Sequence, residues 1–180
     1  MSSLISSGSA SGTGSMTLVA PVTNSNQTIT LPDATGTVMV SGNMPAFSAS
    51  LSSGQTITNN TDTVVLYDTE AFDTASAYTP ATGRFLPLVA GYYQINVNIS
   101  LSGSVITLAS SGIRKNGTLT NYVGTSAFTF TSTPYRFSGS ALIYCNGSTD
   151  YIDTTAYISA TTGNNVVAGS VFSGILVRAA

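Results

Sequence analysis

The clearest pattern in the chain is a strict alternation of apolar and polar side chains between residues 93 and 101. Every odd position there is a large apolar residue, and every even position is Gln, Asn or Ser. Successive side chains of a β-strand point to opposite faces of the sheet. The segment is therefore predicted to be an antiparallel strand with one buried face and one wet face.

The carboxyl-terminal part of the chain shows a different pattern. Val166-Val167, Val171-Phe172 and Ile175-Leu176-Val177 are apolar at both phases of the alternation. A strand with this pattern is buried on both faces. In a two-layer sandwich only the inner face of a strand meets the core, so we expect a neighbouring subunit to cover the outer face.

The rest of the chain is predicted to contain short strands separated by turns. Two Asn-Gly pairs, at 116–117 and 146–147, supply the positive φ angles that tight hairpin turns require. No stretch has the periodicity of a helix. The expected architecture is therefore all-β, as a sandwich, jelly roll or barrel. The additional strands are expected at residues 63–67, 84–86, 104–108, 128–131, 135–145 and 151–159.

The first 44 residues differ from the rest. Residues 1–15 are almost entirely Ser, Gly, Thr and Ala, and residues 16–43 carry only short strand-like pieces. Such pieces are too short to form a core of their own. We predict an extended amino-terminal β-arm over residues 1–44 that anchors the protein, followed by a folded knob over residues 45–180. The apolar side chains expected to anchor the arm are Leu18, Val19, Ile29 and Leu31.

The composition argues against several classes of partner. Only 7% of the residues are charged, the net charge is −2 and the mean hydropathy is +0.27. Nucleic-acid binding needs clustered Lys and Arg, which are missing, so no nucleic-acid partner is expected. The first residues do not resemble a signal peptide, and no apolar run approaches the ~18 residues of a membrane helix. We expect synthesis in a host cytoplasm, no membrane partner, and apolar surface covered by other subunits.

The side chains that most enzymes use are missing or isolated. The chain has no histidine, and Cys145 is its single cysteine, so no triad and no intrachain disulfide can form. We therefore predict no catalytic residues, no cofactor and no enzymatic activity. Asp68, Glu70 and Asp73 lie close enough in sequence for a Ca²⁺ site, but we interpret them as a solvated strand end and loop and predict no metal site.

Two groups of aromatic residues have different predicted roles. The first group, together with Val171 and Ile175, is assigned to packing in the core or around a trimer axis. It consists of Phe47, Phe85, Tyr93, Phe137 and Phe172. The second group lies in or beside turn-rich segments, and it either packs at sheet edges or presents rings for glycan or protein contacts. It consists of Tyr78, Tyr122 and Tyr135.

Residues 68–93 resemble the globular head of the complement C1q/TNF family. The shared pattern is an acidic strand end, a loop with Tyr, a Gly-basic-Phe triplet, a proline, a glycine and an aromatic pair. Gly83, Arg84, Phe85, Gly91 and Tyr93 fall on it, and the segments 45–49, 115–117 and 171–176 agree with the family. The resemblance implies a ten-stranded jelly-roll sandwich that forms a tight homotrimer.

Residues 17–37 are similar to linker segments of phage fibre and virion proteins. We therefore predict a bacteriophage structural protein at the virion surface, with a role in capsid decoration or cementing. The arm of residues 1–44 would dock on capsid or other virion proteins, and the knob would project outward. The alternative is a tail-fibre tip or receptor-binding module that recognises a host-surface glycan or protein.

Overall fold

A computed structural model describes residues 44–127, 129 and 134–180, and among the earlier residues only 13, 17, 22, 24–26 and 28. The chain divides into two compact units, Met1–Thr37 and Val38–Ala180. The second unit contains all the strands described below. The arm residues Leu18, Val19, Ile29 and Leu31 and most of the predicted strand at 128–131 lie outside the described residues.

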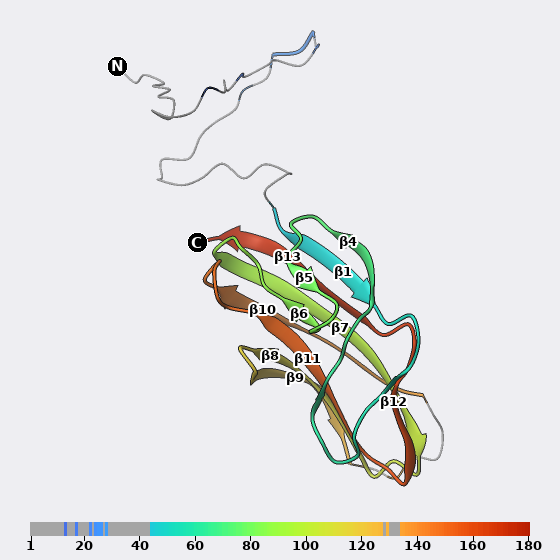
Figure 1. The fold of residues 1–180 in the computed structure, drawn as a ribbon. Coiled ribbons are helices and arrows are strands. Elements are labelled where there is room, and N and C mark those ends of the chain that lie inside the picture. Colours follow the sequence, from blue (N-terminus) through green and yellow to red (C-terminus); the bar gives the residue numbers. More distant parts are fainter. Residues whose placement is uncertain are drawn as a thin grey trace. The chain divides into compact units, whose positions relative to one another are not determined.

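The described residues form thirteen strands and contain no helix (Figure 1). Four of these strands are only two residues long, which is why the number exceeds the ten expected from the family resemblance. The strands are β1 (Ala46–Ser50), β2 (Gln55–Thr56), β3 (Thr63–Val64), β4 (Thr69–Asp73), β5 (Tyr78–Thr79), β6 (Arg84–Phe85), β7 (Gly91–Ser104), β8 (Leu108–Lys115), β9 (Thr118–Ser126), β10 (Tyr135–Cys145), β11 (Ile152–Ser159), β12 (Thr162–Val166) and β13 (Val171–Ala179).

The strands form two antiparallel sheets that pack face to face (Figure 1). The seven-stranded sheet has the order β2-β12-β7-β13-β1-β4, and β10 pairs with the other edge of β7. The six-stranded sheet has the order β5-β6-β11-β8-β9, and β3 also pairs with β11. The fold is therefore an all-β sandwich, as the sequence predicted.

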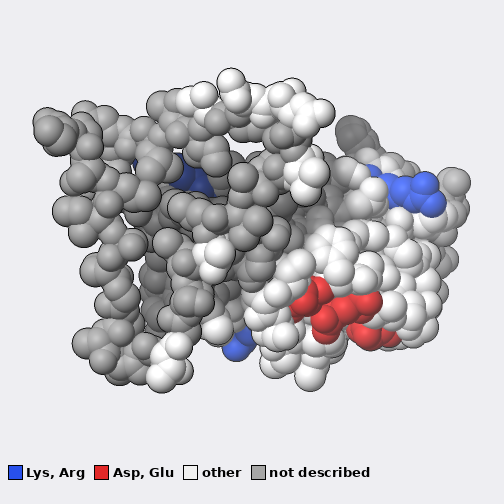
Figure 2. Space-filling view, turned by 90° about the horizontal axis from the view of Figure 1, so that it is seen from above, with Lys and Arg blue, Asp and Glu red and all other residues white. Residues whose placement is uncertain are grey.

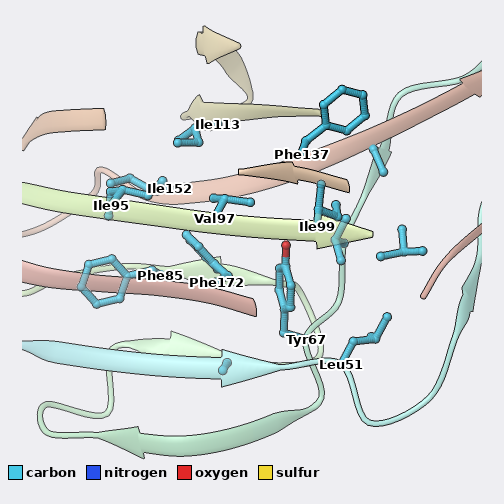
Figure 3. Packing of buried hydrophobic residues seen from close by; sticks show 14 of the residues in the cluster. Leu51, Tyr67, Phe85, Ile95, Val97, Ile99, Ile113, Phe137, Ile152 and Phe172 are labelled. Carbon is cyan, nitrogen blue, oxygen red and sulfur yellow. The ribbon is translucent and has the colours of Figure 1, made fainter. Parts of the chain in front are cut away.

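Aromatic and branched side chains from both sheets fill the space between the layers (Figure 3). Phe47 packs against Phe85 with ring centroids 4.3 Å apart, and it meets Phe172 edge-on at 4.8 Å. Tyr67 is fully buried, and its hydroxyl lies 3.0 Å from Thr154 Oγ1. Burial raises the pKa of the Tyr67 hydroxyl because the phenolate would lose its water.

The alternation between residues 93 and 101 is confirmed, and so is the strand predicted at 135–145. All five odd residues from Tyr93 to Leu101 are buried in the core. The strand predicted at 151–159 corresponds to β11, which begins one residue later. The strict alternation therefore located β7, the strand that pairs with β10, β12 and β13 in the seven-stranded sheet.

Two other local predictions were wrong. Residues 104–108 do not form one strand, because the chain turns after β7 at Val105, whose φ is 52°, and β8 begins at Leu108. The pair Asn146-Gly147 does not close a hairpin, because β10 and β11 belong to different sheets. Asn146 instead accepts hydrogen bonds at Oδ1 from the backbone N–H groups of residues 148–150, so its side chain organises a crossing between the layers.

Candidate functional site

The seven-stranded sheet turns one face to the core and the other away from it, and the strand registers decide which side chains meet on the outer face. Tyr92 of β7 lies opposite Tyr144 of β10, with ring centroids 5.4 Å apart. Gln94 lies between Leu142 of β10 and Ile175 of β13. Three adjacent strands therefore bring large side chains together on a surface that the core does not cover.

Five large hydrophobic residues make up this surface, which we call the outer apolar patch. Their exposed fractions range from 42% for Tyr92 and Tyr144 to 59% for Val177. Contiguous exposed apolar side chains on a soluble domain mark an interaction site more often than single ones do. The patch consists of Tyr92, Leu142, Tyr144, Ile175 and Val177.

The rest of the same face is mainly polar, with two apolar exceptions. The next row across the sheet runs from Ser173 through Asn96 to Ser140, and the row after it pairs Asn98 with Val171. Phe72 of β4, which is 51% exposed, lies on the same face. On β7, β10 and β13 the large apolar side chains therefore gather toward the end at Gly91, and hydroxyl and amide groups predominate farther along. A partner that covers this face would meet both kinds of surface.

The side chains predicted for core or trimer packing separate into two sets. Phe47, Phe85, Tyr93 and Phe172 are buried in the core, and so is Phe137. Val171 and Ile175 point to the outer face, where Val171 is half-buried and Ile175 is 46% exposed. Only the second set can therefore contact another subunit directly.

Sequence reasoning missed three members of the outer apolar patch, namely Tyr92, Leu142 and Tyr144. A signal was present, because residues 141–145 are apolar at both phases, as the last strand is. Tyr92 immediately precedes the alternating segment and lies on the face of the strand that carries its polar side chains. Residues 141–145 could therefore have been predicted, like the last strand, to have an outer face covered by a partner, which would have identified Leu142 and Tyr144 as candidates.

The outer face of the six-stranded sheet carries a second feature, a cavity of about 440 Å³. At one side of it, Arg114 Nε and Nη2 donate to the two carboxylate oxygens of Asp153 at 2.7 and 2.9 Å. The hydrogen bond to Asp153 raises the pKa of the Arg114 guanidinium. Tyr122 of β9, also in the cavity lining, is 65% exposed.

A hydrogen-bonded network fixes the turns next to this sheet. Asp150 accepts from Lys115 Nζ at 2.8 Å, from Asn116 Nδ2 at 2.8 Å and from the backbone N–H of Asn146 at 3.0 Å. These donors, Lys115 first, lower the pKa of the Asp150 carboxyl. The network ties the β8–β9 hairpin to the connection between β10 and β11.

Two of the three carboxylates considered for Ca²⁺, Asp68 and Asp73, bind protein donors. Asp68 accepts from the backbone N–H and the hydroxyl of Ser52 at 2.7 and 2.6 Å, and these bonds lower its pKa. Asp73 accepts from the backbone N–H groups of Ala75 and Tyr78. Within the part of the chain that the structure describes, no cluster of three or more such side chains is arranged to hold a metal ion.

Two further observations concern Cys145 and the membrane. Cys145 is buried, and burial raises the pKa of its thiol to about 11, so it is protonated at neutral pH.

Among the described residues there is no helix with the length and apolar character needed to cross a membrane.

The two antiparallel layers, their strand order and the filled core define a jelly-roll sandwich. The C1q domain family matches residues 46–177, and the chain belongs to this family. Domains of this kind are generally binding or structural modules without enzymatic activity, and they often form trimers. No protein with a curated description matches the sequence significantly.

Solved structures agree with this assignment at the level of the fold. The globular domain of a zebrafish complement 1qA protein superposes with a TM-score of 0.58 at 17% identity, covering 76% of this chain and 99% of that chain. Murine APRIL superposes with a TM-score of 0.56 at 7% identity, covering 74% of this chain and 99% of that chain. At these identities the likeness concerns the fold alone.

Proposed function

We propose that this protein is a homotrimeric structural module without enzymatic activity, and that the outer apolar patch is its threefold interface. The observation that carries the proposal is the position of Ile175, Leu142 and Tyr92, which project from three adjacent strands away from their own core. The membership of a family whose domains often form trimers supports it.

The energetics favour covering this patch. Each Å² of apolar surface removed from water contributes about 25 cal/mol, and complete burial of one Leu, Ile or Val side chain contributes about 1.5–3 kcal/mol. Few charges oppose the approach of three copies, because only 7% of the residues are charged. In the view of Figure 2, blue and red atoms form a few separate groups with neutral described surface between them.

The direct test is a charge placed in the patch. Ile175→Glu would bring a carboxylate into an apolar interface, where it loses hydration without gaining a partner. We expect wild-type protein to sediment as three copies at micromolar concentration and the variant to sediment as a monomer. Sedimentation velocity measures both states.

The matched control is Tyr122→Glu, which places the same charge at an exposed aromatic position on the outer face of the other sheet. This variant should remain trimeric. A wild-type monomer at micromolar concentration, or an Ile175→Glu variant that folds and stays trimeric, would contradict the proposed interface.

For the particular assembly, we propose that the trimer decorates or cements a bacteriophage capsid at the virion surface, with synthesis in the host cytoplasm. The support comes from the sequence: residues 17–37 are similar to virion linker segments, and residues 1–15 have small side chains. Small polar residues let a backbone approach another surface closely and add a strand to a sheet edge. In this proposal residues 1–44 bind capsid or other virion proteins, and residues 45–180 project outward.

Fusing residues 1–44 to an unrelated trimeric carrier tests this arrangement. Binding must offset about 1–2 kcal/mol of backbone entropy for each residue ordered. Three arms linked in one trimer should therefore stay bound to the particle under conditions in which a single arm dissociates. We expect the fusion to occupy native sites on particles that lack the protein, as electron microscopy can reveal. Replacing Leu18, Val19, Ile29 and Leu31 with Ser is the control and should abolish occupancy.

If only the isolated knob binds particles, the arm is not the anchor. If purified knob attaches to host cells and blocks infection, a receptor-binding role replaces the decorating role. That second function has an observation of its own in its favour, the cavity on the outer face of the six-stranded sheet.

A further inference from the structure

The cavity lies on the side of the six-stranded sheet that faces away from the core. Along β11 the core side chains are Ile152, Ala156 and Ile158, so Thr155 and Tyr157 between them point outward. The registers place Thr155 beside Gly112, and Gly112 beside Tyr122. With a volume of about 440 Å³, the cavity falls within the roughly 300–1,000 Å³ of small-molecule sites.

The cavity is lined by hydrogen-bonding groups that the protein itself does not use. The side chains of Ser110, Thr125 and Thr155 make no hydrogen bond within the described part of the chain, and the same holds for Asp62. Each hydroxyl can both donate and accept, and the carboxylate can accept from several donors. These groups converge on a hollow that is flanked by the ring of Tyr122.

The charges around the cavity indicate which ligands fit. Asp153 is fully buried and holds both of its oxygens against the Arg114 guanidinium. Asp62 also acts electrostatically on Arg114. Asp62 and Arg114 both line the cavity, and Asp153 already neutralises Arg114, so the remaining charge is negative and disfavours an anionic ligand.

We propose that this cavity binds a neutral sugar unit of a glycan. A hexose presents several hydroxyl groups that match the unused donors and acceptors of Ser110, Thr125 and Asp62, and it has an apolar C–H face that packs on an exposed aromatic ring such as Tyr122. The site belongs to the opposite sheet from the outer apolar patch, so trimer formation leaves it open. The proposal names a site for the glycan-recognition alternative and does not depend on a capsid location.

Full-length protein should be applied to an array of neutral and sialylated glycans, and the strongest neutral binder should then be titrated by calorimetry. Tyr122→Ala should weaken binding about tenfold or more, because it removes the exposed ring. Thr125→Ala should weaken it less. The control Thr118→Ala removes an exposed hydroxyl of the same strand outside the cavity and should leave the affinity unchanged.

Three results would overturn the proposal: no neutral glycan binds at millimolar concentration, sialylated glycans bind in preference, or Tyr122→Ala binds as tightly as wild type. Sedimentation of the same samples distinguishes a failure of the glycan site from a failure of the proposed trimer. A trimeric Tyr122→Ala variant that has lost binding supports the site, and a monomeric wild type that binds the glycan contradicts only the trimer.

Discussion

At the scale of single residues, two glycines of the segment 68–93 are required for different structural reasons. Gly91 lies where β7 meets the end of β13, and a Cβ there would collide with the backbone oxygen of Arg178 and come within 2.8 Å of Leu176 Cδ1. Gly83 has a φ of +65°, and a Cβ there would collide with the backbone oxygen of Val65. Close approach explains the first glycine, and backbone conformation together with close approach explains the second.

Asp150 provides a pH-dependent test of the turn network. Its folded pKa is lowered by Lys115, Asn116 and Asn146, so its stabilisation is complete above the ordinary carboxyl pKa of about 4 and is lost as the pH falls below that value. Asp150→Asn should reduce the free energy of unfolding by about 1–2 kcal/mol at pH 7. The difference from wild type should shrink at pH 3, as urea denaturation at fixed protein concentration measures.

The control for this experiment is Glu70→Gln. Glu70 is exposed and makes no hydrogen bond or ion pair among the described residues. Its replacement should change the unfolding free energy by less than about 0.5 kcal/mol. An Asp150→Asn variant as stable as wild type at pH 7, or one whose deficit is the same at pH 3, would show that the network does not stabilise the fold.

At the scale of elements, periodicity located strands only where large side chains mark the buried face. β7, β10 and β11 were recognised for this reason, whereas β8 and β9 were not. The core positions of β8 include Ala109 and Ser111, and its outer positions include Ser110 and Gly112, so small residues occupy both faces and no alternation appears. Only the hairpin between them was visible in the sequence, through Asn116 and Gly117, whose φ angles are 53° and 77°.

The small residues of these two strands are needed by their neighbours. A Cβ at Gly124 would collide with the ring of Phe137, and one at Gly112 would collide with Leu119. Such requirements arise from side chains that are distant in sequence or paired across a hairpin. No pattern read along one strand can reveal them, and the cavity around Gly112 was unpredictable for the same reason.

At the scale of the whole molecule, the sequence contained enough information for the fold class but not for the position of the binding surfaces. Surplus apolar residues in the last strand indicated that some outer face needs a partner. The position of that face depends on the strand registers, which place Ile175 and Leu142 on either side of Gln94. Among the turn-region aromatics, Tyr78 is buried and Tyr122 is exposed, a distinction set by packing between layers.

The structure also leads to a prediction about the smallest folded unit. Every described strand lies between Ala46 and Ala179, and the buried core is built from the same residues. Deleting residues 1–43 should therefore leave a cooperative unfolding transition and β-type circular dichroism. Loss of both would mean that the first 43 residues complete the sandwich.

The pairing of β1 with β13 has a consequence for the order of events during synthesis. The first strand of the knob pairs with β4 on one side and with β13 on the other, and β13 is the strand that joins β1 to β7. During translation, β1 and β7 are therefore made long before the strand that joins them. Until β13 leaves the ribosome, Phe47 has no Phe172 to pack against and the largest sheet stays open. Such a topology folds slowly and late, so a chain truncated before β13 cannot complete the sandwich or assemble.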